Sequence, residues 1–288
     1  MTNRSDDRVH GLAIGGVRVP GLMYGTAWKE NATESLALGA LTAGFRGIDT
    51  ANQRKHYDEA GVGRAIARAL EAGIGRDELF VQTKFTHLAG QDHRVPYDPA
   101  APVGEQVAQS FASSLAHLGV AHVDSLILHG PSLRDALAPD DRAAWRAIEA
   151  IAETGGARLI GISNVTARQL DELVALARIP PAFVQNRCHA DRGWDRAVRA
   201  RCAERGMVYQ AFSLLTANRD VVAGRTVRAI AARHGVTAAQ VILRFACQVG
   251  MVPLTGTTSP QHMRDDLAIS TLALADDEIA AIDAAGER

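Results

Sequence analysis

The chain has 288 residues, of which 47% are apolar and 22% charged, and its formal net charge is −1. This composition is typical of a globular protein with enough apolar material for a core. Near-neutral charge without long basic blocks argues against nucleic acid or an anionic membrane as partners. No run of roughly eighteen uncharged apolar residues and no apolar leader occurs, so we expect neither a membrane helix nor a secretory signal.

The cysteines indicate a reducing compartment. Cys188, Cys202 and Cys247 are widely spaced and form no C-x-x-C pair. Such thiols are typical of reduced packing residues in an intracellular protein. We therefore predict a cytoplasmic protein, present as a monomer or a weak oligomer.

Short apolar runs alternate with amphipathic segments along the chain. Residues 11–20 are expected to form a hairpin that turns at Gly15-Gly16 and covers one end of the fold. The expected strands are Leu22–Gly25, Phe45–Ile48, Leu79–Thr83, Val123–Leu128, Leu159–Ile162, Phe183–Gln185, Val208–Ala211 and Val252–Leu254. Helical spacing is expected at 33–43, 59–72, 105–117, 141–153, 166–177 and 195–204, as a pair over 225–248, and at Pro260–Ala268 and Asp276–Ala285.

Eight strands that each precede a helix, with no linker, predict a single (β/α)8 barrel domain over residues 1–288. Its N-terminal hairpin acts as a lid, and extra helices follow the last strand. The alternative is a doubly wound open sheet, which normally carries a glycine-rich turn after its first strand. The Gly61-Val62-Gly63 triplet instead falls inside an expected helix. We interpret it as a helix-packing feature rather than a dinucleotide-binding turn.

Polar residues gather where the expected strands end, which is where barrel enzymes carry their function. Asp49, Lys84 and His129 follow three of these strands, and Tyr57 stands at the entrance of the next helix. Each has an ordinary structural explanation by itself: a helix cap, a rim salt bridge, a core histidine or a packed tyrosine. Their coincidence on neighbouring strands of one barrel instead predicts a shared site at its mouth.

The four groups form a coherent set for proton transfer. A free phenol has a pKa near 10, and a nearby ammonium from Lys84 is expected to lower it. Asp49 would hold Lys84 charged. His129 would supply a second hydrogen bond to an oxygen held at the Tyr57 hydroxyl. This arrangement suits an oxygen that gains negative charge, as a carbonyl does when it accepts hydride.

The chain resembles the aldo-keto reductases over about Leu22 to Leu267. The motifs that carry the resemblance are GFRGIDTA…YDEAGVGRAI, VQTKF, LILHGP, GISNV, FVQN and VPLTGTTSPQHMRDDL, in this order and spacing. The resemblance implies reduction of a small-molecule aldehyde or ketone by NADP(H), with NAD(H) as the alternative. It identifies Tyr57 as the proton donor and Asp49, Lys84 and His129 as its partners.

The resemblance also implies a cofactor site. Ser163, Asn164 and Gln185 would hold the nicotinamide carboxamide, and Phe212 would stack on the ring where the family usually has tyrosine. The remaining implied cofactor residues are Gly25, Thr26, Asp49, Ser213, Leu215, Gly256, Thr257, Ser259, His262, Arg264 and Asp265. The substrate pocket is expected to be formed by Trp28, Tyr57, Tyr97, His129 and Trp194.

The sequence departs from the family pattern in two places. Counting back from Glu59 and Gly63 with the commonest spacing places His56, not Tyr57, at the proton donor. Only a phenol suits the role, so we predict Tyr57. Beyond the last strand, Gly256 stands where many members carry a lysine for the 2′-phosphate, and His262 replaces an arginine over the adenine.

The segment after the last strand predicts an anion site. Ser259 is expected at the N-cap of a helix and Pro260 at its first position, which leaves free backbone N–H groups. An ordinary capped helix is the alternative. Thr257, Ser259 and Arg264 are the expected partners of a 2′-phosphate. We therefore predict that NADPH is preferred over NADH, by a smaller margin than in relatives that carry the lysine.

Other functions are less compatible with the sequence. His87, His93 and His129 lack the spacing and carboxylate partners of a metal site, so no metal is expected. The GISNV segment lacks the second glycine of a nucleophile elbow. The rival hypothesis is a regulatory subunit of the same fold that binds the cofactor with little turnover.

Overall fold

The computed structural model describes residues 7–286. Eight parallel strands form a closed barrel in the order β10-β3-β4-β5-β6-β7-β8-β9. They are β3 (Met23–Gly25), β4 (Gly47–Asp49), β5 (Phe80–Phe85), β6 (Val123–Leu128), β7 (Ala157–Ser163), β8 (Phe183–Arg187), β9 (Val208–Phe212) and β10 (Met251–Thr255). The predicted (β/α)8 barrel is confirmed. Its extension to residues 1 and 288 lies outside the described residues, and the assignment as one domain stays a prediction.

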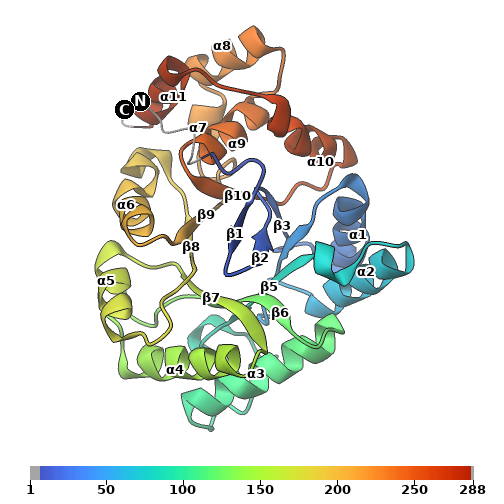
Figure 1. Ribbon diagram of the computed structural model, residues 1–288, viewed down its shortest axis with the longest axis vertical. Coiled ribbons are helices and arrows are strands. Elements are labelled where there is room, and N and C mark those ends of the chain that lie inside the picture. The colour runs from blue at the N-terminus through green and yellow to red at the C-terminus, as the bar shows by residue number, and fades with distance from the viewer. Residues whose placement is uncertain (1–6, 287–288) are drawn as a thin grey trace.

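Helices surround the strand ring (Figure 1). They are α1 (Thr33–Ala43), α2 (Glu59–Glu71), α3 (Val103–Leu118), α4 (Pro139–Glu153), α5 (Ala167–Leu176), α6 (Arg196–Glu204), α7 (Arg219–Val222), α8 (Arg225–His234), α9 (Ala238–Gln248), α10 (Pro260–Leu267) and α11 (Asp276–Ala285). The predicted helix pair over 225–248 is α8 and α9, separated at Gly235 with a φ of 66°. None of the described helices is long and apolar enough to cross a membrane.

The N-terminal hairpin crosses the centre of the barrel in Figure 1 and closes one end. Strands β1 (Leu12–Ile14) and β2 (Val17–Val19) pair antiparallel. Gly15 and Gly16 turn between them with φ of 53° and 80°, conformations that glycine adopts without steric cost. Val17 and Val19 are buried in one cluster with inward-facing residues such as Phe80 and Phe183. The expected lid is therefore also an apolar plug.

The Gly61-Val62-Gly63 segment lies inside α2, as predicted. A Cβ at Gly63 would stand only 2.0 Å from the backbone carbonyl oxygen of His117 on α3. The missing side chain lets the two helices approach closely. This confirms the helix-packing role for Gly63.

The strand ends differ from the predicted bounds in a way that matters for the site. Asp49 is the last residue of β4, and Lys84 lies within β5 rather than after it. Ser163 and Phe212 likewise belong to their strands, and the strand predicted to end at Gln185 continues to Arg187. Because pairing extends this far, the positions of these side chains are fixed by the barrel ladder and not by loops.

Candidate active site

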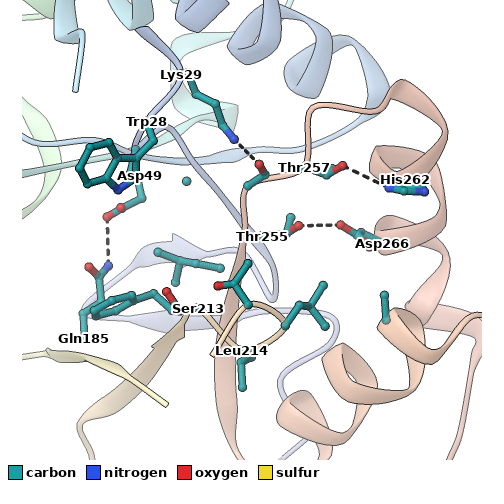
Figure 2. A pocket seen from close by; sticks show the side chains of 18 of the residues that line it. Trp28, Lys29, Asp49, Gln185, Ser213, Leu214, Thr255, Thr257, His262 and Asp266 are labelled. Atoms are coloured by element: carbon teal, nitrogen blue, oxygen red, sulfur yellow. Dashed lines mark hydrogen bonds between the residues drawn. The ribbon is translucent and has the colours of Figure 1, made fainter. Parts of the chain in front are cut away.

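A cavity of about 540 Å³ opens at the carboxyl ends of the barrel strands. One end is lined by Asp49, Tyr57 and His129, and the other by Thr257 and His262. Figure 2 shows the same sequence of side chains, from Asp49 and Gln185 past Ser213 and Leu214 to the start of α10. An elongated ligand could therefore contact the acid–base residues and the α10 end together.

The acid–base end is built on a buried ion pair. The Lys84 Nζ lies 2.7 and 2.6 Å from the two Asp49 carboxylate oxygens and donates to the Thr50 carbonyl at 2.8 Å. Lys84 and Asp49 are 1% and 3% exposed. Burial lowers the pKa of Lys84, while the carboxylate opposes this change. The Asp49 carboxylate therefore favours the ammonium form of Lys84 and holds the side chain in place.

Tyr57 lies above this pair. The Lys84 Nζ is 5.2 Å from the centroid of its ring, and the His129 ring centroid is 6.0 Å away. Burial raises the pKa of the Tyr57 phenol, and the negative charge of Asp49 raises it further. The Tyr57 pKa is therefore raised in this state and not lowered as expected from Lys84, mainly because of burial. Tyr57 is consequently a protonated phenol at neutral pH.

His129 follows β6 and is oriented by Thr86. The Thr86 hydroxyl lies 2.6 Å from the His129 Nδ1, and burial, with the Lys84 charge, lowers the pKa of His129 to about 3. The ring is therefore neutral near pH 7. A hydroxyl beside Nδ1 suits the tautomer that carries its proton on Nε2, since the hydroxyl can donate to Nδ1 in that form. His129 can then donate one hydrogen bond into the cavity.

His56 does not take part in this group. Its ring stacks on Trp28 with centroids 3.9 Å apart, and its carbonyl accepts from the Trp28 backbone N–H at 2.7 Å. Tyr57 lines the cavity, whereas His56 does not. The geometry therefore favours Tyr57, not His56, as the proton donor near Lys84.

Of the residues expected to hold the nicotinamide carboxamide, only some present free polar atoms to the cavity. Ser163 and Gln185 line the cavity, but the Gln185 Nε2 is bonded to Asp49 Oδ1 at 3.0 Å. The Gln185 Oε1 remains as an acceptor. Asn164 has a φ of 52° and donates to the His129 carbonyl and the Ser163 hydroxyl, outside the cavity lining. Its side chain therefore supports the loop rather than facing a ligand.

Phe212 ends β9 and lines the cavity, followed by Ser213 with a φ of 57°. The Arg187 guanidinium lies over the Phe212 ring, 5.7 Å from its centroid. Leu215 also contributes to the wall. The aromatic ring is thus available to a flat group in the cavity and is braced by a cation.

The far end is formed by the residues after β10. Gly25, Gly256, Thr257, His262 and Asp265 line it. Ser259 caps α10 by accepting from the His262 N–H at 3.3 Å, as expected from the sequence. The predicted N-cap is confirmed, although the Ser259 side chain is outside the cavity lining.

Several predicted contacts are not brought into the cavity. Trp194 is fully buried against Phe245, with ring centroids 5.0 Å apart, so its assignment to the substrate pocket is wrong. Tyr97 packs on Phe85 and donates to the Thr86 carbonyl at 2.8 Å, so it is wrong as well. Arg264 is exposed and bonds Gln261 at 2.7 Å on the surface of α10. Thr26 is buried under the site, where its hydroxyl donates to the Asp49 carbonyl at 2.9 Å.

Sequence reasoning missed two charged residues at the far end. Lys29 lines the cavity, and its ammonium donates to the Gly256 carbonyl (Figure 2). Asp266 accepts from the Thr255 hydroxyl at 2.7 Å, and burial raises its pKa to about 6. Lys29 directly follows Trp28 shortly after the first barrel strand, and this position in the sequence could have identified it as a site residue. The Asp266 position depends on the turn of α10, which has no such signal.

The described residues hold no cluster of histidine, cysteine, aspartate and glutamate suited to a metal ion. The three cysteines are buried, and burial raises the pKa of Cys202 to about 12. The acid–base groups at the cavity are the buried Asp–Lys pair, the phenol and the neutral imidazole. These are the features expected from the family that the sequence resembles.

The comparisons agree. The profile of the Aldo/keto reductase family matches residues 12–287, and the chain belongs to this family. It is 34% identical over 270 residues to an aldo-keto reductase of Mycolicibacterium vanbaalenii, across 93% of this chain and 88% of that protein. It is 32% identical over 281 residues to morphine 6-dehydrogenase of Pseudomonas putida, with the same coverages of 93% and 88%.

Solved structures share the fold. An aldo/keto reductase from Brucella melitensis matches with a TM-score of 0.82 and 26% identity, across 96% of this chain and 98% of that one. The Bombyx mori aldo-keto reductase in complex with NADP matches with a TM-score of 0.79 and 26% identity, across 94% and 90%.

Proposed function

We propose that this protein catalyses the reversible, nicotinamide-dependent reduction of an aldehyde or ketone to an alcohol. The observation that carries the proposal is the grouping of Tyr57 and His129 on one cavity wall, with the Asp49–Lys84 pair behind them. A protonated phenol and a neutral imidazole donor suit an oxygen that becomes more basic during the reaction.

Each residue has a distinct part. Tyr57 gives its proton to the carbonyl oxygen, and the His129 Nε2–H donates a hydrogen bond to the same oxygen. Lys84 stabilises the phenolate that remains, and Asp49 keeps Lys84 charged and in place. In the oxidation direction the phenolate takes the alcohol proton. A bound nicotinamide cofactor would supply the hydride.

The cavity fits a dinucleotide in its shape and donors. Ser163, the Gln185 Oε1 and Phe212 would meet the nicotinamide end, while Thr257, His262 and Asp265 would meet the adenosine end. Gly25 and Gly256 both line the cavity. A Cβ at Gly256 would stand 3.3 Å from the Gly25 carbonyl oxygen, so a side chain there would crowd the space that the two glycines leave open. Ser213, Leu215 and Gly256 would complete the lining.

NADPH is the proposed cofactor, with NADH as the weaker alternative. The Bombyx mori relative was solved with NADP. Gly256 lacks the cationic side chain that suits a 2′-phosphate, but Lys29 brings an ammonium to the same place. Ser259 contributes as the α10 cap, and Arg264 only through the surface of that helix.

The substrate is a small carbonyl compound, and Trp28 is the aromatic residue best placed to meet it. Trp28 lines the cavity and is 68% exposed. We place the enzyme in the cytoplasm as a monomer or weak oligomer, on the basis of its reduced buried thiols and near-neutral charge.

The test follows NADPH absorbance with a panel of aldehydes and ketones. Turnover that depends on Tyr57 is the expected result. A folded protein that binds NADPH but reduces no carbonyl would overturn the proposal and favour a regulatory subunit.

A further inference from the structure

A layer of amide side chains lies inside the barrel beneath the acid–base group. Gln82 is paired in register with Asp49, and Gln185 with Gln210 on the opposite side of the ring. All three glutamines are 3% exposed or less. Barrel interiors are normally filled by branched apolar side chains, so three buried amides at one level call for an explanation.

The amides converge on one oxygen of Asp49. Gln82 Nε2 and Gln185 Nε2 donate to Asp49 Oδ1 at 2.7 and 3.0 Å. Both also donate to Gln210 Oε1, at 2.9 and 3.0 Å. Gln210 Nε2 returns a bond to Gln82 Oε1 at 3.1 Å. Lys84 bonds both carboxylate oxygens, so within the described part of the chain Oδ1 has three donors and Oδ2 only Lys84.

The orientation of each amide follows from the charge of the carboxylate. Gln82 and Gln185 must present N–H groups to Asp49, and Gln210 must then present its oxygen to both of them. Donors on a buried carboxylate stabilise its negative charge. The layer therefore favours negative charge on Oδ1, the carboxylate oxygen with three donors.

We propose that Gln82 and Gln210 are positioning residues for the proposed reaction, which hold the charge of Asp49 on Oδ1 and thereby set how readily Tyr57 releases its proton. The inference rests on the proposed function. Neither residue lines the cavity, so each acts through Asp49.

None of the other described charged groups around the Tyr57 phenol prevents the amide layer from acting on it through Asp49. Asp49 and Lys84 face Tyr57 from β4 and β5, and His129 from β6. Glu59 of α2 acts on Lys84, and His56 acts on His129. Since Asp49 raises the pKa of Tyr57, loss of the amide donors should raise it further.

The experiment compares Gln82→Met and Gln210→Met, which remove the amide at nearly constant length. The acidic limb of the pH profile for alcohol oxidation should move upward by about 0.5–1 pH unit in each. The double variant should move less than the sum, because Gln210 acts through Gln82 and Gln185. Ser125→Ala is the matched control: Ser125 is in register with Gln82, fully buried, and its hydroxyl has no hydrogen-bond partner in the described residues.

A second readout needs no cofactor or turnover. In protein with ¹³C-labelled tyrosine, the Tyr57 Cζ signal, assigned with Tyr57→Phe, should move in Gln82→Met and stay in place in Ser125→Ala. An unmoved signal and profile in a folded Gln82→Met, or an equal change in Ser125→Ala, would overturn the inference. An inactive wild type whose Tyr57 signal responds would instead contradict the proposed function alone.

Discussion

The two ends of the cavity are built by different means. At the acid–base end, Asp49 and Lys84 are buried in the barrel and bonded to each other through both carboxylate oxygens. At the α10 end, the Thr257 Oγ1 and the His262 Nδ1 are 3.5 Å apart at the exposed start of the helix, and Gly256 has no side chain. One end is determined by strand pairing and the other by a loop and a helix cap.

This difference separates the chemistry from the choice of cofactor. A charge at the buried end cannot be changed without leaving its partner uncompensated. A charge at the half-exposed end can be supplied from another segment, as Lys29 supplies it from the β3–α1 connection. We therefore expect substitutions at the barrel end to abolish turnover, and substitutions at the α10 end to adjust affinity and selectivity.

Tyr57→Phe should have the largest effect on rate. It removes the proton donor and leaves the rest of the wall in place, so kcat should fall by about 10²–10⁴-fold while the Kd for NADPH changes little. Steady-state kinetics and fluorescence titration measure the two quantities. His56→Phe is the control, since His56 stacks on Trp28 outside the cavity lining. A large loss in His56→Phe with Tyr57→Phe still active would reverse the assignment.

Lys84→Met should damage both activity and stability. The phenolate loses its stabilising charge, and Asp49 is left buried without its ion-pair partner, which costs about 3–5 kcal/mol in the free energy of unfolding. Urea unfolding and the pH profile of oxidation check this. Arg64→Met breaks the exposed pair with Glu34 and should cost about 0–1 kcal/mol. Equal costs in both variants would contradict the distinction between buried and exposed pairs.

Cofactor selectivity should depend on Lys29. Loss of one charge-assisted hydrogen bond costs about 1.5–3 kcal/mol, so Lys29→Met should reduce the NADPH-over-NADH ratio of kcat/KM by roughly ten- to a hundredfold. A Cβ at Gly256 would stand 3.6 Å from the Lys29 Nζ. Gly256→Lys should therefore widen the ratio most in the Lys29→Met background, where no second ammonium competes. An unmoved ratio in both variants would remove this end from 2′-phosphate recognition.

Asp266→Asn should stabilise the protein at neutral pH. The folded pKa of Asp266 is about 6 because of burial, above the usual value of about 3.9. Its favourable contribution is present below about pH 4 and is lost as pH rises through 6. The substitution should raise the free energy of unfolding by about 1–3 kcal/mol at pH 7.5 and by little at pH 4. A free energy of unfolding that does not rise in Asp266→Asn at pH 7.5 would contradict this.

Most of the acid–base end could be predicted from the sequence because strand positions carry it. Asp49 and Lys84 lie on consecutive barrel strands and His129 directly follows the next one, and their order along the chain determines that they meet. Trp194 could not be placed in this way. It lies in an irregular turn where Gly193, Trp194 and Asp195 all have positive φ, and this turn carries the ring to Phe245 in the outer core.

The amide layer and Lys29 show a second limit. Gln82 reads as an ordinary strand residue; it meets Asp49 through pairing of neighbouring strands, but only the closed barrel brings it within bonding distance of Gln210. Lys29 reaches Gly256 because β3 and β10 are neighbours in the ring. Contacts between residues more than a hundred positions apart depend on barrel closure, which local patterns in a single sequence do not contain.

Phe212→Ala should have the smallest effect, because an aromatic stack is worth roughly 0.5–1.5 kcal/mol. The Kd for NADPH should rise by about two- to twelvefold, measured by fluorescence titration, with little change in the pH profile. Arg187→Met separates the two possible origins of this effect, since Arg187 lies over the ring without lining the cavity. If Phe212 binds by its own stacking, Arg187→Met should leave the Kd nearly unchanged. If Arg187→Met weakens binding as much as Phe212→Ala, the cation supplies the affinity and the ring only positions it.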